Sequence, residues 1–208
     1  MTQAAFQSEL RDGMRVDWDV PIEMDDGLVL RADVFRPNDD RPHPVLLSYG
    51  PYGKGLSFQE GYPSAWNQMV KDHPDTAQGS SNVYQNWEVA DPEKWVPDGY
   101  ICVRVDSRGA GRSPGMIDHH SRRETRDLYL CVEWAGRQSW SNGKIGTWGA
   151  SALGRVQFQT AEKDPPHLVC ICPLVAGPQY EYQEYYPNGC IRSEYLEQLF
   201  SLGFNTLA

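Results

Sequence analysis

The sequence has no run of about 18 or more apolar residues, the length that a transmembrane helix requires. It has no basic tract either, and its formal net charge is −9 over 208 residues, so no nucleic-acid partner is expected. The N-terminus lacks both a basic start and an apolar core, which argues against a signal peptide. These absences favour a cytoplasmic protein without a nucleic-acid or membrane partner.

Cysteine is scarce, and its number is odd. Three of the five cysteines lie in apolar runs, so buried free thiols are favoured over disulfides. Cys170 and Cys172 alternate along a predicted strand, where core packing is expected for both. The other three are Cys102, Cys131 and Cys190.

Patterns for cofactors and metals are also missing. Gly109 and Gly111 follow a predicted strand, but the third glycine of a dinucleotide fingerprint is absent and Pro114 interrupts any helix there. The adjacent His119 and His120 have no further ligands at zinc-site spacing. We therefore expect no cofactor and no metal. Arg108, in the same loop, is expected to tie the loop to the sheet.

What is present is the pattern of an α/β protein. The composition, 40% apolar and 23% charged, is that of a globular chain. Residues 16–24 and 28–35 flank the turn signal Asp25-Asp26-Gly27 and predict an antiparallel hairpin at the edge of a sheet. Strands then alternate with helices, which predicts a mainly parallel sheet with right-handed crossovers. These strands are expected at 44–49, 100–106, 145–148 and 169–173, and the helices at 122–138 and 152–163.

Three regions follow from this pattern. Residues 1–14 are expected to be a loose N-terminal arm, residues 15–176 the α/β core, and residues 177–208 the start of a helical cap. Within the core, residues 51–92 form a long excursion rich in aromatic residues. A connection of this length is usually functional. Its aromatic side chains either line a pocket or pin the loop to the surface, and both interpretations stay open.

Ser151 stands between the predicted strand 145–148 and the predicted helix 152–163. A serine on such a tight turn is typical of a nucleophile elbow, which needs small neighbours because its backbone is strained. The second glycine lies three residues after Ser151, whereas the general motif has it two residues after, so an ordinary loop of small residues is the alternative. The small neighbours are Gly149, Ala150, Ala152 and Gly154.

Several motifs in order resemble those of the X-prolyl dipeptidyl-peptidase and cocaine-esterase hydrolases, a branch of the α/β-hydrolases. The resemblance covers roughly residues 16 to 190. The motifs are Asp26-Gly27 with Ala32-Asp33-Val34 and Arg36-Pro37, then Pro44-Val45-Leu46-Leu47 and Pro51-Tyr52-Gly53-Lys54, then Asp106, Arg108-Gly109, Gly111, Ser113 and Gly115, and finally Glu133-Trp134, Trp140 to Gly146 and Gly149-Ala150-Ser151.

The resemblance implies roles for three residues. Ser151 is the implied nucleophile, and the Tyr52 hydroxyl and the Ala152 backbone N–H are the implied donors of the oxyanion hole. The family usually has Tyr after the nucleophile, so Ala152 is a departure that keeps the donor but changes the packing. Family members act on esters or on amides, and the sequence does not choose between them. Glu181 and Glu184 form either an acidic patch for a substrate amino group or a solvated face.

The expected function is therefore that of a serine hydrolase acting by acyl transfer on an ester or amide. The alternative is a catalytically inactive α/β-hydrolase fragment that serves in binding or assembly. His167 is the only histidine after Ser151, and it follows a helix of about 12 residues, or about 18 Å, that leads away from the serine. It is a poor general base, and no triad acid is identified. The family's last strands, cap and C-terminal β-domain have no counterpart, so we expect a truncated hydrolase fold and either a homo-oligomer or a missing C-terminal segment.

Overall fold

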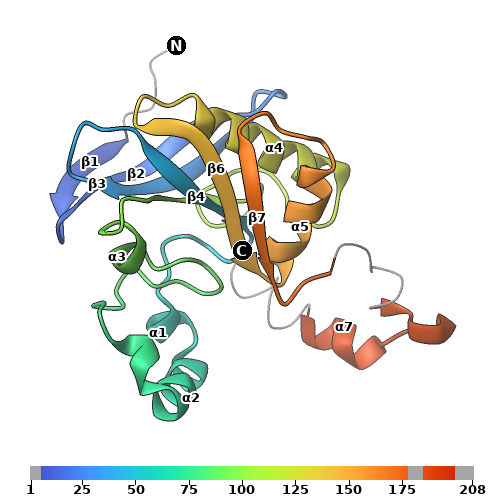
Figure 1. Cartoon of the computed structure of the whole chain (residues 1–208). Helices are drawn as coiled ribbons and strands as arrows, with labels where there is room; N and C mark the ends of the chain where they lie inside the picture. The colour runs from blue at the N-terminus through green and yellow to red at the C-terminus, as the bar shows by residue number, and fades with distance from the viewer. Residues whose placement is uncertain (1–5, 178–184, 200–208) are drawn as a thin grey trace.

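The computed structural model describes residues 6–177 and 185–199, and its centre is a seven-stranded mixed sheet (Figure 1). The strand order is β1-β2-β3-β5-β4-β6-β7. Pairings of β4 with β5 and β6, and of β6 with β7, are parallel, and the others are antiparallel. The strands are β1 Gln7–Arg11, β2 Met14–Glu23, β3 Val29–Pro37, β4 His43–Gly50, β5 Ile101–Asp106, β6 Ser141–Ala150 and β7 Leu168–Leu174.

The N-terminal arm predicted at residues 1–14 is wrong from Gln7 onward. β1 pairs antiparallel with β2 and forms the edge of the sheet, so the predicted hairpin of β2 and β3 lies one strand further in. Asp12 and Gly13 both have positive φ, 49° and 79°, as a two-residue hairpin turn requires. This Asp-Gly pair was the overlooked signal. The β1 edge is also held by the Trp18 indole, which donates to Glu9 at 2.8 Å.

β4 and β5 lie inside the sheet, as the continuous apolar run at residues 44–49 predicts for β4. Every residue of β5 is buried. Side chains of the central strands and of α4 make up the main core, and a smaller core lies around Phe35 and Tyr84. The sheet is therefore packed on both faces at β5 and over most of β4.

The helices form two groups. α4 and α5 pack on each other and on β6, while α1, α2 and α3 lie in the excursion between β4 and β5, below the sheet in the view of Figure 1. Ser121 caps α4 by accepting from the N–H of Glu124 at 3.0 Å, which confirms half of a capping box. The helices are α1 Phe58–Gly61, α2 Pro63–Asp72, α3 Pro92–Trp95, α4 Arg122–Gly136, α5 Ala152–Ala161 and α7 Ser193–Leu199, with 3₁₀ turns at Pro74–Ala77 and Pro187–Gly189.

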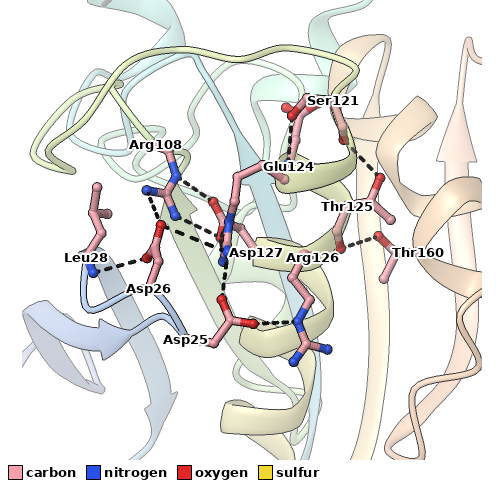
Figure 2. A network of polar contacts seen from close by, with 11 residues as sticks. Asp25, Asp26, Leu28, Arg108, Ser121, Glu124, Thr125, Arg126, Asp127 and Thr160 are labelled. Carbon is pink, nitrogen blue, oxygen red and sulfur yellow. Dashed lines mark hydrogen bonds and ion pairs between the residues drawn. The ribbon is translucent and has the colours of Figure 1, made fainter.

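Arg108 holds its loop against α4 and the β2–β3 turn, and not against the sheet as predicted. Its guanidinium pairs with Asp127 at 3.0 Å and with Asp26 at 2.9 Å (Figure 2). Arg123 bridges Asp127 and Asp25 in the same network. Asp127 is fully buried, and the two arginines that pair with its carboxylate offset the unfavourable desolvation of its charge. The network joins three segments that are distant in sequence.

β7 is exposed, although its apolar sequence predicted a buried strand. It ends the described sheet, and the side chains of Val169, Cys170 and Leu174 reach solvent. The predicted core packing of Cys170 is therefore wrong, and Cys190 is exposed as well, whereas Cys102 and Cys131 are buried free thiols. An apolar run does not reveal whether a strand has neighbours on both sides.

The remaining region contains α7 and the second 3₁₀ turn. Glu181 and Glu184, the candidate acidic patch, lie outside the described residues. Among the helices of the described ranges, none combines the length and the apolar character needed to span a bilayer.

Candidate active site

The backbone of Ser151 has the strained conformation that the turn between β6 and α5 requires. Its φ is 51° and its ψ is −117°, values at which glycine is favoured because a Cβ crowds the backbone. Ser151 is the N-cap of α5, which begins at Ala152. The predicted strand, turn and helix are thus confirmed, and they place the serine hydroxyl at the carboxyl end of a parallel strand.

The small residues around Ser151 are needed because chain segments cross closely there. A Cβ added to Gly149 would lie 2.4 Å from the Cβ of Leu153. One added to Gly154 would lie 2.7 Å from the Cβ of Ala176 and 3.1 Å from the carbonyl of Leu174. The carbonyl of Leu174 also accepts the N–H of Ser151 at 2.9 Å. The unusual spacing of the second glycine therefore suits the packing of α5 against the end of β7.

Tyr52 reaches the same place from the segment that follows β4. Burial is the main cause that raises the pKa of its hydroxyl, and the nearby Glu88 raises it further. A hydrogen bond with Ser151 acts in the opposite direction. The hydroxyl is therefore neutral near pH 7, and it neighbours the serine oxygen. Tyr52 and Ser151, identified separately in the sequence, are brought together.

Lys54 anchors the segment that carries Tyr52. Its backbone N–H donates to Asp106 at 2.6 Å, and its buried ammonium lies 2.6 Å from Asp19 and 2.8 Å from Asp33. The amide of Asn86 donates to its carbonyl. Backbone and side chain are both held, so the position of Tyr52 two residues earlier is restricted.

The backbone N–H of Ala152 is the third part of the predicted site. Ala152 is the first residue of α5 and is buried. The N–H groups of the first helical turn have no acceptor within the helix and carry the positive end of its dipole. The amide of Ala152 can thus donate a hydrogen bond to the carbonyl oxygen of a substrate that is attacked by Ser151.

Glu88 is a residue of this site that sequence reasoning missed. Its carbonyl accepts the N–H of Ala150 at 3.3 Å, and its φ is 60°. Burial raises the pKa of its carboxyl group to about 7, and the nearby Trp87 and Tyr52 lower it in part. The one available signal was its place in the long excursion, which the sequence marked as functional without singling out this residue.

The aromatic residues of the excursion divide into two groups. Phe58, Tyr62, Trp66 and Trp87 form one cluster, with ring centroids 4.4 Å apart for Tyr62 and Trp87 and 4.8 Å for Phe58 and Trp87. This cluster adjoins Glu88. Burial is the main cause that raises the pKa of Tyr62, and the charge of Glu88 raises it further. Tyr84 instead packs with Trp18 and Phe35, away from the serine. Tyr84 therefore pins the excursion, while the cluster borders the site.

None of the five histidines, all within the described ranges, is placed beside Ser151. His167 hydrogen-bonds Glu133 of α4 at 3.0 Å, at the far end of α5, as its place in the sequence indicated. His43 lies between Asp39 and the carbonyl of Gly99. The other three are His73, which follows α2, and His119 and His120, which precede α4.

Comparison with known proteins bears on this arrangement. The model of the X-Pro dipeptidyl-peptidase (S15) family matches residues 26–207. The chain belongs to the S15 family. Among S15 relatives, cocaine esterase from Rhodococcus sp. (strain MB1 Bresler) is 32% identical over 178 residues, which are 85% of this chain and 26% of the esterase. A putative Xaa-Pro dipeptidyl-peptidase from Streptomyces avermitilis is 25% identical, over 89% of this chain and 29% of the relative.

Solved structures show the same relationship. A CocE/NonD family hydrolase from Staphylococcus aureus superposes with a TM-score of 0.66 at 34% identity, over 82% of this chain and 30% of that one. An acetyl xylan esterase from Thermoanaerobacterium, with a TM-score of 0.58 at 13% identity, shares the fold. The predicted α/β-hydrolase fold is therefore confirmed for this S15 chain. The chain spans about a quarter to a third of the length of these S15 relatives.

Proposed function

We propose that this chain carries the nucleophile and the oxyanion hole of a serine hydrolase that acts by acyl transfer on an ester or amide. Its relatives include an esterase and putative peptidases, which supports a hydrolase of this general kind. The observation that carries the proposal is the strained backbone of Ser151, with Tyr52 near enough for Ser151 to affect its pKa. Strain is retained at positions where a protein needs a particular geometry.

The chemistry follows from the positions of the three groups. The Ser151 oxygen attacks the substrate carbonyl, whose oxygen becomes negatively charged in the tetrahedral intermediate. The Tyr52 hydroxyl and the Ala152 N–H then donate to that oxygen, and the leaving group departs from an acyl-enzyme. Water resolves the acyl-enzyme, which completes the hydrolysis. A general base must take the serine proton, and no histidine of the described residues is in reach of it.

The rival function is that of an inactive α/β module used in binding or assembly. The absence of a neighbouring histidine within the described residues is the observation that favours it. Fold alone does not establish activity. The rival leaves the strain at Ser151 unexplained, since a binding module gains nothing from a serine at a position that suits glycine.

Labelling with a fluorophosphonate separates the two. The purified chain is treated with the probe, digested, and mapped by mass spectrometry, with Ser151→Ala as the test variant. Ser107→Ala, which changes a buried serine at the end of β5, is the control. Labelling is expected to be slow, because no histidine of the described residues is in reach of the serine proton. The proposal predicts that the label lies on the peptide containing Ser151, is retained in Ser107→Ala and is lost in Ser151→Ala. A folded wild-type chain that takes no label at Ser151 would support the rival.

A further inference from the structure

A groove lies between α4 and α5, at the end of α5 that is remote from Ser151. Its volume is about 630 Å³, within the range of pockets that hold small organic molecules. A helix rises about 1.5 Å per residue, so roughly 12–18 Å of chain separate the groove from the serine. The residues that carry the argument are Arg122, Arg126 and Tyr129 of α4, with Gln159 of α5 and Glu162 and Lys163 just after its end.

The floor of this α4–α5 groove is held by hydrogen bonds between the two helices. The hydroxyl of the buried Thr125 donates to Oε1 of Gln159 at 3.2 Å. The hydroxyl of Thr160 donates to the carbonyl of Thr125 at 3.5 Å (Figure 2). Side chains on each wall are three or four residues apart, the spacing that places them on one face of a helix. The shape of the groove therefore follows from the packing of α4 on α5.

The walls of the groove carry a positive charge, in contrast with the chain as a whole. Arg122, Arg126 and Lys163 bring three positive charges and Glu162 one negative charge, which leaves +2 when histidine is counted as neutral. The formal net charge of the chain is −9. Positive charges gathered in a cleft raise the local concentration of anions. The groove therefore favours an anion with two negative charges.

The donors of these cations are available to a ligand. Nε of Arg126 donates to Asp25 at 2.8 Å, and its guanidinium carbon lies 5.1 Å from the ring centroid of Tyr129, so the side chain is held in place. The two terminal nitrogens of Arg126 make no hydrogen bond within the described ranges. Arg122 and Lys163 are exposed and have no ion pair in the part of the chain that the structure describes. Two guanidinium groups and one ammonium group thus line the groove with unused N–H donors.

We propose that the α4–α5 groove binds a small organic phosphate monoester, because it places two arginines and a lysine around a cavity larger than a phosphate group. A phosphate dianion matches the charge of the walls, and its oxygens accept paired hydrogen bonds from guanidinium groups. The half-buried ring of Tyr129 and the methylene stems of Arg122 and Lys163 provide apolar surface for the organic part. Three cations are too few for the long phosphate backbone of a nucleic acid. The site does not depend on chemistry at Ser151.

Calorimetric titration of the full chain with phenyl phosphate tests the proposal. Low ionic strength limits screening, and at about pH 8 the ligand is doubly ionised, since its second pKa is about 6. Phenyl sulfate is the matched ligand with one negative charge, and inorganic phosphate lacks the organic group. We expect saturable binding of phenyl phosphate, about fivefold tighter than that of either comparison ligand. Absence of saturable binding would overturn the proposal. Equal affinity for phenyl sulfate would overturn the charge match, and equal affinity for inorganic phosphate would overturn the assignment of a monoester.

Charge variants of the walls make the test specific to this groove. Arg122→Gln and Lys163→Gln should each weaken the binding of phenyl phosphate about fivefold, whereas Glu162→Gln should strengthen it about twofold or more. Lys144→Gln is the matched control, since Lys144 is an exposed lysine of β6 that does not line the groove. Equal losses in Lys144→Gln and in the groove variants would show that only net charge matters, which would overturn the proposal.

Amide chemical shifts in the full chain locate the bound ligand. We expect phenyl phosphate to shift the amides of residues 121–126 and 159–163, equally in wild type and in Ser151→Ala. Because these shifts need no reactive serine, they are expected even if Ser151 takes no fluorophosphonate label and the proposed hydrolase function fails. Shifts centred on Ser151 and lost in Ser151→Ala would place the ligand in the proposed active site and would overturn a separate groove site.

Discussion

Ser151 is a non-glycine residue in a backbone conformation that favours glycine. At φ 51° and ψ −117° a side chain costs on the order of 1–3 kcal/mol, which glycine avoids. The sequence predicted this conflict from the small residues around the turn. It did not predict Glu88, because the position of that side chain depends on a positive φ in an irregular segment and on the proximity of Tyr52, which is distant in the sequence. Motif-based reasoning finds residues with fixed spacing and misses those placed by a loop.

Glycine at position 151 should therefore stabilise the chain while removing its reactivity. We expect Ser151→Gly to raise the free energy of unfolding by about 1–2 kcal/mol, because the strain of a Cβ at this turn is relieved. Ser151→Ala is the matched control, since it removes the hydroxyl but keeps the Cβ. Urea denaturation of the three chains measures the difference. Equal stability of the glycine and alanine variants would show that the turn is not strained.

Glu88 should make stability depend on pH. Its pKa is raised by burial to about 7 in the folded chain from an ordinary value of 4.5, so the folded state binds a proton that the unfolded state has lost between these values. The wild type therefore loses stability as pH rises from about 4.5 to about 7 and no further above that. Glu88→Gln lacks this loss, so its melting temperature should exceed that of wild type by a few degrees more at pH 8 than at pH 4.5. Parallel melting curves at the two pH values would refute the assignment.

At the scale of elements, the sequence predicted where the central strands lie along the chain. The order of the strands in the sheet is known only from the structure. The run at residues 44–49 was expected to be a strand covered on both faces, and β4 is buried except at Pro44 and Leu46, which are partly buried, while β5 is buried throughout. β7 has an equally apolar sequence, yet it is the outermost strand of the described sheet and Val169, Cys170 and Leu174 are exposed. Asp12 and Gly13 carried a hairpin signal for β1, but the polar sequence of that strand hid it. The local sequence pattern thus predicts whether a segment forms a strand, whereas the exposure of that strand depends on which elements pack beside it.

The segment after β4 depends on Lys54 for its position. We expect Lys54→Met to lower the free energy of unfolding by roughly 3 kcal/mol, because the buried Asp33 and its neighbour Asp19 lose their cation. Arg112→Met is the control, since Arg112 pairs with Asp19 from an exposed position and such pairs contribute about 1 kcal/mol or less. Chemical denaturation compares them. Equal losses in the two variants would show that Lys54 does not anchor this segment.

At the scale of the whole molecule, the described sheet has one polar and one apolar edge. β1 carries charged and polar residues, whereas β7 presents Val169 with 59% of its surface exposed and Leu174 with 42%. An apolar edge strand favours pairing with another chain. The mainly parallel topology followed from the alternation of strands and helices in the sequence. The asymmetry of the edges did not, because it depends on which strands lie outermost.

The β7 edge should make the purified chain associate. We expect sedimentation velocity to show concentration-dependent oligomers, and Val169→Lys to shift them toward monomer by placing a charge on the edge. Val83→Lys is the control, since Val83 is similarly exposed, at 51%, but lies in the excursion. A monomeric wild type at all concentrations, or an equal effect of both lysines, would contradict a role for this edge.

The central claim is that Ser151 is a nucleophile served by Tyr52, and acylation tests it most directly. The chain is incubated with an activated aryl ester, and the acyl group is located by intact mass and peptide mapping in wild type, Ser151→Ala and Tyr52→Phe. We predict slow acylation on the peptide with Ser151, since no histidine of the described residues is in reach of its proton, and none there in Ser151→Ala. The rate should be about a hundredfold lower in Tyr52→Phe, the usual cost of losing one oxyanion donor. Acyl groups spread over surface lysines, with the same pattern and rate in all three chains, would contradict the account.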